Sequence, residues 1–466
     1  MGLKENEGSD TPQILAIIAA CIPGVSSALL FSWPSPFLLV LINDQENYDI
    51  SEIQAELLPI FLPIGILISS IFLFKIHDKI GRKYTLLLLC VPQFLFWLIT
   101  IFARDIYSFY IGRFICGVAD GIMYAALPIY ISEVATPRVR GTWGNGQTFS
   151  FNAGFLLINV LGNYFTIHQT AYICLTLPIL SAILFLRIPE SPYYYLMKGQ
   201  DERARTSLQW LLRKPDIESD FLQLKADVQR QISETGTWPD LYNIVSNRKA
   251  LRASLFLRFA QQSAGIGTFE NYIQYIFDKS NSGMLSPQIS SIIFSALLWI
   301  VMTLFSIGLL DKFGRRKSFI ISSLGCSILL AAESIYFFLD QFYSDSIDLS
   351  NCQWFPLAAL MVYIITYCGG LGPLPSLMAG ELFSASIKGK GLGVTNVGLA
   401  IILFASAFIF QSLTTSVGLY APFAVYSTLT FICFMLSFYV IPETKGKTLE
   451  EIQQDLKGNA IIRVTF

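Results

Sequence analysis

The chain has 466 residues, of which 53% are hydrophobic and 14% are charged, and its mean hydropathy is +0.54. Soluble domains carry about 25% charged residues, so this composition excludes an ordinary soluble protein and indicates a chain surrounded mostly by lipid. The formal net charge of −1 provides no basic patch for nucleic acid. The eight cysteines lack metal-ligand spacing and fall mostly in apolar runs, where free thiols pack as small hydrophobic groups.

Apolar runs separated by charged or turn-rich breaks predict about twelve membrane-spanning helices, because about 20 apolar residues cross a hydrocarbon core. The predicted fold class is therefore an all-α membrane protein. The first run is too long for the apolar region of a signal peptide, so we expect it to be retained as a span. The predicted spans cover residues 13–42, 54–76, 84–103, 107–131, 142–165, 170–188, 251–277, 287–311, 317–339, 354–383, 390–415 and 419–441.

Lysine and arginine are concentrated in the loops that follow even-numbered spans, which predicts that both termini face the cytoplasm. The one long polar segment, 189–250, shows helical spacing of apolar residues over 200–212 and 217–232, so we expect short amphipathic helices there. The predicted organisation is a cytoplasmic tail, a six-helix bundle, a cytoplasmic helical loop, a second six-helix bundle and a second cytoplasmic tail. Their limits are 1–12, 13–188, 189–250, 251–441 and 442–466.

Three short motifs occur twice, in the same order, at the cytoplasmic ends of matching spans, which indicates two parallel halves. Acids and bases recur in them at fixed spacing, so we interpret them as a salt-bridge gate that closes the cytoplasmic side and separates when the halves rock inward. The alternative is that the bases only anchor the loops on the positive-inside side. The gate residues are Asp78, Arg82, Glu133 and Arg140 in the first half and Asp311, Arg315, Glu381 and Lys388 in the second.

A set of short motifs is spread over nearly the whole chain. They are Gly112-Arg113-Phe114 with Gly117, Tyr130 to Val134, Arg140-Gly141-Thr142, Asn152, Pro189-Glu190-Ser191-Pro192, Gln261 to Ile266, Gly372 to Pro375, Glu381-Leu382-Phe383 and Pro442 to Gly446. As a set, these motifs resemble the sugar porter family of the major facilitator superfamily, which includes the glucose transporters, and the pattern is most similar to the insect facilitated trehalose transporters. The resemblance implies two six-helix bundles and alternating access, with trehalose or a hexose as cargo, at the plasma membrane, by a monomer that needs no cofactor and catalyses no reaction.

The family reads sugar hydroxyls with amide side chains of the fifth and seventh helices, because an amide offers donors and an acceptor without a charge. Gln261 and Gln262 match the seventh-helix pair, and Thr148 aligns with the family's fifth-helix glutamine. The resemblance therefore implies substrate contacts, although polar amides also join membrane helices to one another. The candidate contacts are Gln261, Gln262, Tyr272, Asn152, Gln147 and Thr148.

Other family site positions carry different residues here, namely Gly267, Trp299 and Ser376, and the eleventh-helix Asn-Trp pair is missing. These departures make glucose itself less expected. A disaccharide, a different polyol and an unrelated small solute stay open as cargo.

Asp120 lies inside the fourth span, seven residues after Arg113 and on the same helix face. It is either a structural partner of Arg113 or the site of a proton in a proton-coupled carrier. The first span has no acid where proton-coupled members of the family carry one, so facilitated transport is favoured. A third hypothesis is a sugar receptor that does not transport and signals through its cytoplasmic loop, which the short tails disfavour.

Overall fold

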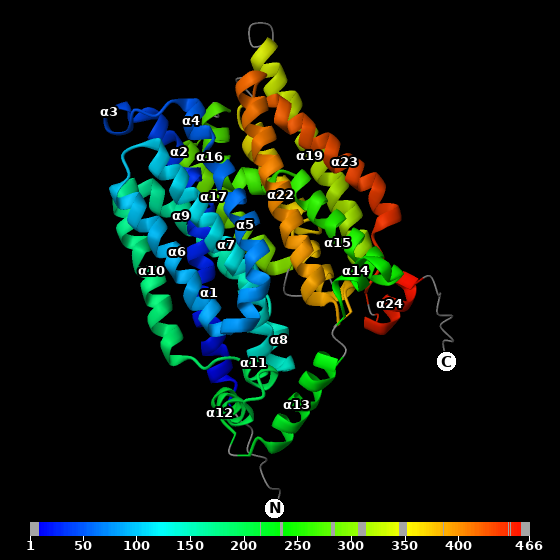
Figure 1. Ribbon diagram of the computed structural model, residues 1–466. Helices are drawn as coiled ribbons and strands as arrows, with labels where there is room; N and C mark the ends of the chain where they lie inside the picture. Colours follow the sequence, from blue (N-terminus) through cyan, green and yellow to red (C-terminus); the bar gives the residue numbers. More distant parts are fainter. Residues whose placement is uncertain are drawn as a thin grey trace, which may run out of the picture.

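The computed structural model of the chain describes residues 9–457, apart from 215, 234–235, 281–284, 306–313, 344–351, 385, 446 and 448. For residues 73–78, 137, 141–142 and 449–450 it describes the backbone only. The regular secondary structure of the described residues is helical throughout (Figure 1). Within this part of the chain, nine helical segments are long and apolar enough to cross a membrane.

The first six predicted spans all form helices. The first span breaks at Ser32 and Trp33, directly before Pro34, because a proline lacks the N–H group that would continue the hydrogen-bond ladder. The helices of this half are α1 Thr11–Phe31, α2 Pro34–Asn43, α3 Gln45–Tyr48, α4 Glu52–Glu56, α5 Leu58–Ile80, α6 Arg82–Phe102, α7 Ile106–Val134, α8 Pro137–Trp143, α9 Gly146–Tyr164 and α10 Ile167–Arg187.

The long polar segment folds into four short helices, α11 Pro192–Met197, α12 Asp201–Leu212, α13 Glu218–Ser233 and α14 Trp238–Asn243. The predicted helices over 200–212 and 217–232 are thereby confirmed. Leu208 of α12 packs with Phe221 and Val228 of α13 in a small hydrophobic core of their own. The segment is therefore a folded unit rather than a plain connection.

The other predicted spans also form helices, and two of them are broken. The seventh breaks at Ala264 and Gly265, where Gly265 adopts a φ of 83° that favours glycine, and the tenth breaks between Cys368 and Leu374. The helices are α15 Val245–Ser263, α16 Ile266–Lys279, α17 Pro287–Leu304, α19 Arg315–Tyr343, α20 Phe355–Cys368, α21 Leu374–Leu382, α22 Lys388–Ser416, α23 Tyr420–Val440 and α24 Leu449–Lys457.

The short helices α11, α12, α13 and α24 lie at one end of the molecule, and α3 and α4 lie at the other (Figure 1). We name the first the inner end, following the orientation expected from the lysine and arginine distribution, and the second the outer end. The two halves meet where α5 packs on α22, α9 on α17 and α2 on α16. Any cargo path between the halves must run along these helices.

Glycines allow the closest helix contact of the first half, between α5 and α7. A Cβ atom on Gly117 would lie 1.9 Å from the carbonyl oxygen of Leu62, and one on Gly65 would lie 2.2 Å from that of Phe114. Real Cβ atoms do not approach an oxygen that closely, so both positions require glycine. Small residues at such contacts are how membrane helices gain packing energy.

Candidate substrate path and gates

The predicted amide pair of the seventh span lies in the last turn of α15, directly before the helix break. The Gln261 amide donates a hydrogen bond of 2.8 Å to the carbonyl oxygen of Gly372, at the break of the tenth span. Its own oxygen accepts a hydrogen bond of 3.0 Å from Arg258. The Gln262 oxygen is buried and has no partner within the described residues. In this conformation Gln261 therefore joins the two broken helices, and Gln262 retains a free acceptor.

The fifth-span candidates lie on α9 and are bonded locally. Asn152 donates to the carbonyl oxygen of Thr148 at 2.8 Å, and the Gln147 amide points to the sulfur of Met123 at 3.4 Å. Within the described part of the chain, no hydrogen bond joins them to Gln261 or Gln262. Their substrate contacts stay a prediction.

Across the halves, α9 meets α17 through an aromatic contact. The rings of Phe149 and Trp299 have centroids 5.4 Å apart, and the Trp299 indole N–H is buried without a partner among the described residues. An unpaired buried donor costs about 1–3 kcal/mol. This contact therefore places an aromatic pair and a free N–H donor where the two halves meet.

The outer end is closed by a hydrogen-bonded cluster that we had not predicted, centred on Glu56 of α4. Its carboxylate accepts hydrogen bonds from the hydroxyls of Tyr275, at 2.6 Å, and Thr415, at 2.8 Å. The Tyr272 hydroxyl donates to the Glu56 carbonyl oxygen. Glu56 belongs to the first half and its three partners to the second, so the cluster ties the halves together.

The sequence held one signal for this closure, the two acids Glu52 and Glu56 spaced by four residues at the start of the second span. Glu52 forms a salt bridge of 2.9 Å with Lys279, and both side chains are close to half exposed. Tyr272, which we predicted to bind substrate, is fully buried and belongs to this closure in the present conformation.

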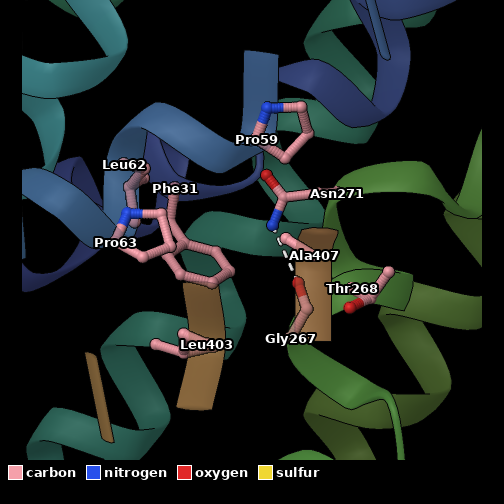
Figure 2. A pocket seen from close by; sticks show the side chains of 9 residues that line it. All are labelled: Phe31, Pro59, Leu62, Pro63, Gly267, Thr268, Asn271, Leu403 and Ala407. Atoms are coloured by element: carbon pink, nitrogen blue, oxygen red, sulfur yellow. Dashed lines mark hydrogen bonds between the residues drawn. The ribbon is translucent and has the colours of Figure 1, made fainter. Parts of the chain in front are cut away.

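Arg113 of α7 crosses to the second half at the same level. Its guanidinium donates to the carbonyl oxygens of Leu30 and Phe31, and at 3.0 Å to the side-chain oxygen of Asn271. Asn271 also donates to the Gly267 carbonyl oxygen at 2.8 Å beside a cavity of about 10 Å³ between the halves (Figure 2). That volume holds about one water molecule and no sugar.

Asp120 lies close enough to Arg113 for their charges to interact, and its role as a structural partner of Arg113 stays a prediction. No salt bridge joins them, and both carboxylate oxygens of the fully buried Asp120 lack a hydrogen-bond partner within the described residues. The physical reason is that the break between α1 and α2 exposes backbone carbonyl oxygens, which take up the guanidinium instead.

At the inner end, each half contains one ion pair from the predicted gate. Arg82 pairs with Glu133 at 3.1 Å in the first half, and Arg315 pairs with Glu381 at 3.1 Å in the second. The hydroxyl of Thr444 donates to Glu381 at 2.5 Å. Each pair lies within one half, so moving the halves apart does not by itself break either of them. Their role as a gate stays a prediction.

The other gate candidates are not in these pairs. Arg140 donates to the backbone oxygens of Ser132 and Ala135 rather than to Glu133. Lys388 forms no ion pair with a described residue; burial, and then the nearby charge of Arg140, hold the pKa of its ammonium below the ordinary value. Asp311 and the side chain of Asp78 fall outside the described residues.

A second feature of both inner ends is a glutamate that caps the next helix. Glu190 accepts hydrogen bonds from the backbone N–H groups of Arg82 and Lys83, and Glu443 accepts from those of Arg315 and Arg316. A carboxylate at a helix start satisfies free N–H groups and the positive end of the dipole. The glutamates of the repeated Pro-Glu-Ser and Pro-Glu-Thr motifs therefore cap the start of a helix in each half.

The surroundings of these two carboxyls differ electrostatically. Burial raises the pKa of Glu190 above its ordinary value, and the N–H donors of Lys83 and Ser191 oppose that rise. Burial acts in the same direction on Glu443, but the N–H donors of Lys445 and Arg315 outweigh it and hold its pKa below the ordinary value. Each capped helix, beginning at Arg82 or Arg315, is preceded by a glycine, Gly81 or Gly314, with a φ of 100° or 90° that favours glycine.

Comparison with known proteins finds matches over nearly the whole chain. The family described as "Sugar (and other) transporter" matches residues 14–456. A facilitated trehalose transporter of Polypedilum vanderplanki is 31% identical over 96% of this chain and 88% of its own length. One of Apis mellifera ligustica is 30% identical over 96% and 89%. Against the longer Drosophila willistoni relative, the chain spans about half the length, 51%.

Among solved structures, the chain is similar to the xylose transporter XylE of E. coli in a partially occluded, inward-open conformation. The TM-score is 0.75 over 94% of this chain and all of that one, at 16% identity. At that identity the likeness shows the fold alone. The twelve-helix arrangement with two repeated halves is thereby confirmed.

Proposed function

Because the chain belongs to the sugar (and other) transporter family, we propose that it carries a sugar by facilitated diffusion, with trehalose and the hexoses as the first candidates. The transport unit is a monomer in the plasma membrane with both termini in the cytoplasm. It uses no cofactor and catalyses no reaction. The two bundles, 13–188 and 251–441, are the moving bodies, and the segments 1–12, 189–250 and 442–466 lie on the cytoplasmic side.

The observation that carries this proposal is the asymmetry between the two ends of the molecule. At the outer end, Glu56 joins the halves through hydrogen bonds, while at the inner end the ion pairs of Arg82 and Arg315 each stay within one half. A transporter that alternates between two states needs an interface that is made in one state and absent in the other. The outer cluster supports this role.

Substrate recognition is proposed at the seventh-span break. Gln262 has a free acceptor there, and exchange of the Gln261 bond to Gly372 for a bond to a sugar hydroxyl links binding to movement of the tenth span. In this proposal the fifth span contributes further contacts to the sugar, through Asn152, Gln147 and Thr148.

The test is uptake of labelled trehalose, glucose and fructose into proteoliposomes at two external pH values. We expect saturable uptake of at least one sugar in the wild type and its loss in Gln261→Ala/Gln262→Ala. Gln209→Ala, an exposed glutamine on α12, is the matched control and leaves uptake unchanged. Absence of uptake of all three sugars in the wild type contradicts trehalose or a hexose as cargo, and absence of uptake of charged sugars as well contradicts sugar transport and favours the receptor hypothesis.

A second candidate, proton-coupled transport, is favoured by one observation, the unpartnered buried carboxylate of Asp120. In that case uptake rises with external acidity and the rise disappears in Asp120→Asn. Uptake that is independent of external pH in both proteins excludes it.

A further inference from the structure

Arg258 places a cation beside the amide pair of the seventh span. It lies on α15, three residues before Gln261 and four before Gln262, so the three side chains share one face of the helix. Along the axis, about one helical turn of 5.4 Å separates Arg258 from Gln262. A single ligand the size of one sugar ring can contact both.

This guanidinium has no counter-charge within the described residues. Its Nη1 atom donates a hydrogen bond of 3.0 Å to the neutral oxygen of Gln261, and its Nε atom is buried without a partner among the described residues. The groups close enough to interact with its charge are the hydroxyls of Tyr124, from the first half, and Tyr367, from the tenth span. Arg258 therefore lies between the halves and is flanked by neutral groups.

An unpaired cation at this depth is unfavourable and marks a functional site by default. Arg258 is partly buried, and a cation that is shielded from water without a counter-charge is destabilising until an anion with good geometry binds to it. Arginine also differs from lysine in presenting a planar fork that binds carboxylate or phosphate oxygens two at a time. With Nη1 bonded to Gln261, the edge formed by Nε and Nη2 remains for such a ligand.

We propose that the cargo is a sugar that carries an oxyanion, with its negative group on Arg258 and a hydroxyl on the free oxygen of Gln262. This inference rests on the proposed sugar transport and narrows its substrate class. The chemistry shared by the possible ligands is an oxyanion on a sugar ring, either the carboxylate of a hexuronic acid or a phosphate ester. The two halves then close favourably around Arg258 only when the anionic sugar is bound. Binding of the sugar is thereby coupled to the movement of the halves.

Glu270 of α16 is the competing explanation for the cation. Its carboxylate interacts electrostatically with Tyr124 and Tyr367, the same tyrosines that flank Arg258, but it forms no salt bridge with Arg258. If Glu270 were the counter-charge, a neutral sugar would suffice and Glu270→Gln would abolish transport. In our proposal Glu270→Gln retains recognition of the anionic sugar.

The experiment compares four probes on the purified protein in proteoliposomes and in detergent: glucuronate, glucose 6-phosphate, inorganic phosphate and glucose. Binding is measured by thermal stabilisation, and transport by uptake at imposed membrane potentials. The variants are Arg258→Gln, Arg258→Lys and Glu270→Gln. Arg252→Gln is the matched control, because Arg252 lies on the same helix and is exposed.

We expect glucuronate to bind, and to enter the proteoliposomes faster when their interior is positive, because transport of an anion moves charge across the membrane. Glucose uptake is expected not to depend on the membrane potential. Arg258→Gln weakens glucuronate binding about thirtyfold or more, the effect of losing a buried charged partner, and changes glucose binding little. Arg258→Lys restores part of the binding and Arg252→Gln changes nothing. A preference for glucose 6-phosphate over glucuronate supports the oxyanion site and assigns the phosphate ester as its ligand.

Two results overturn the inference separately from the proposed function. Normal glucose or trehalose uptake, with no binding of either charged sugar, refutes the oxyanion site and leaves sugar transport intact. Binding of inorganic phosphate alone, without any charged sugar, also refutes it. Absence of uptake and binding for every neutral and charged sugar refutes the proposed function itself.

Discussion

Replacing Glu56 with alanine removes the acceptor that holds the outer ends of the two halves together. Its carboxylate is buried, with 3% of the residue exposed, and accepts hydrogen bonds from Tyr275 and Thr415 across the interface. A hydrogen bond to a charged group contributes about 1.5–3 kcal/mol net. Two such bonds therefore stabilise the closed outer end by at least about 3 kcal/mol.

This magnitude fixes the expected population shift. A loss of about 3 kcal/mol moves an equilibrium between two states by more than a hundredfold, because each 1.4 kcal/mol is about a factor of ten. Glu56→Gln keeps one acceptor oxygen but no charge, so we expect about half the effect. The backbone bond from Tyr272 to residue 56 survives in both variants.

The assay is a distance measurement between spin labels on opposite halves at the outer end. Positions 47 and 342 are exposed there, on α3 and α19, and the exposed Cys352 is replaced by serine in the background. In Glu56→Ala we expect a second, longer distance to dominate. Glu46→Ala, an exposed acid of the same outer segment, is the control and keeps the wild-type distances. A wild-type distribution in Glu56→Ala refutes the claim that Glu56 holds this end closed.

Three further outcomes follow from the packing. Glu190→Ala leaves the N–H groups of Arg82 and Lys83 without their acceptor, at about 1–3 kcal/mol for each buried donor, so the melting temperature in detergent falls, whereas exposed Glu218→Ala changes it little. Gly117→Leu forces α5 and α7 apart and abolishes monodisperse protein in size-exclusion chromatography, whereas Gly389→Ala, with open space around it, is tolerated. Lys279→Gln removes a half-exposed salt bridge worth less than about 1 kcal/mol, so the spin-label distances stay unchanged; opening of the outer end would contradict that assignment.

The fold was predictable because its signals are local. Membrane spans need only long apolar runs, and the loop helices α12 and α13 needed only helical spacing of apolar residues within a polar segment. The duplicated motifs also predicted two equivalent halves. Breaks inside spans were harder, because Gly265 permits a left-handed turn but does not by itself require one.

The candidate site was only partly predictable, because its contacts depend on which helices face each other. In the sequence Glu56 is an ordinary acid at the start of a span, and no pattern predicts that Tyr275 and Thr415 donate hydrogen bonds to it. Arg113 and Asp120 have the correct spacing for a pair, yet Arg113 binds carbonyl oxygens that a break in another helix exposes. Spacing along one helix cannot anticipate a competitor from a second.

The contacts of the repeated inner motifs lie within each half rather than between the halves. Glu190 and Glu443 each tie the start of a helix to the chain that leaves the same half, and the pairs of Arg82 and Arg315 stay within their halves too. All of these contacts join elements of the same half. The outer cluster at Glu56, by contrast, must break whenever that end opens. The two ends therefore differ in what their polar contacts join: the duplicated inner motifs bond within each half, whereas the unrepeated residues around Glu56 join one half to the other.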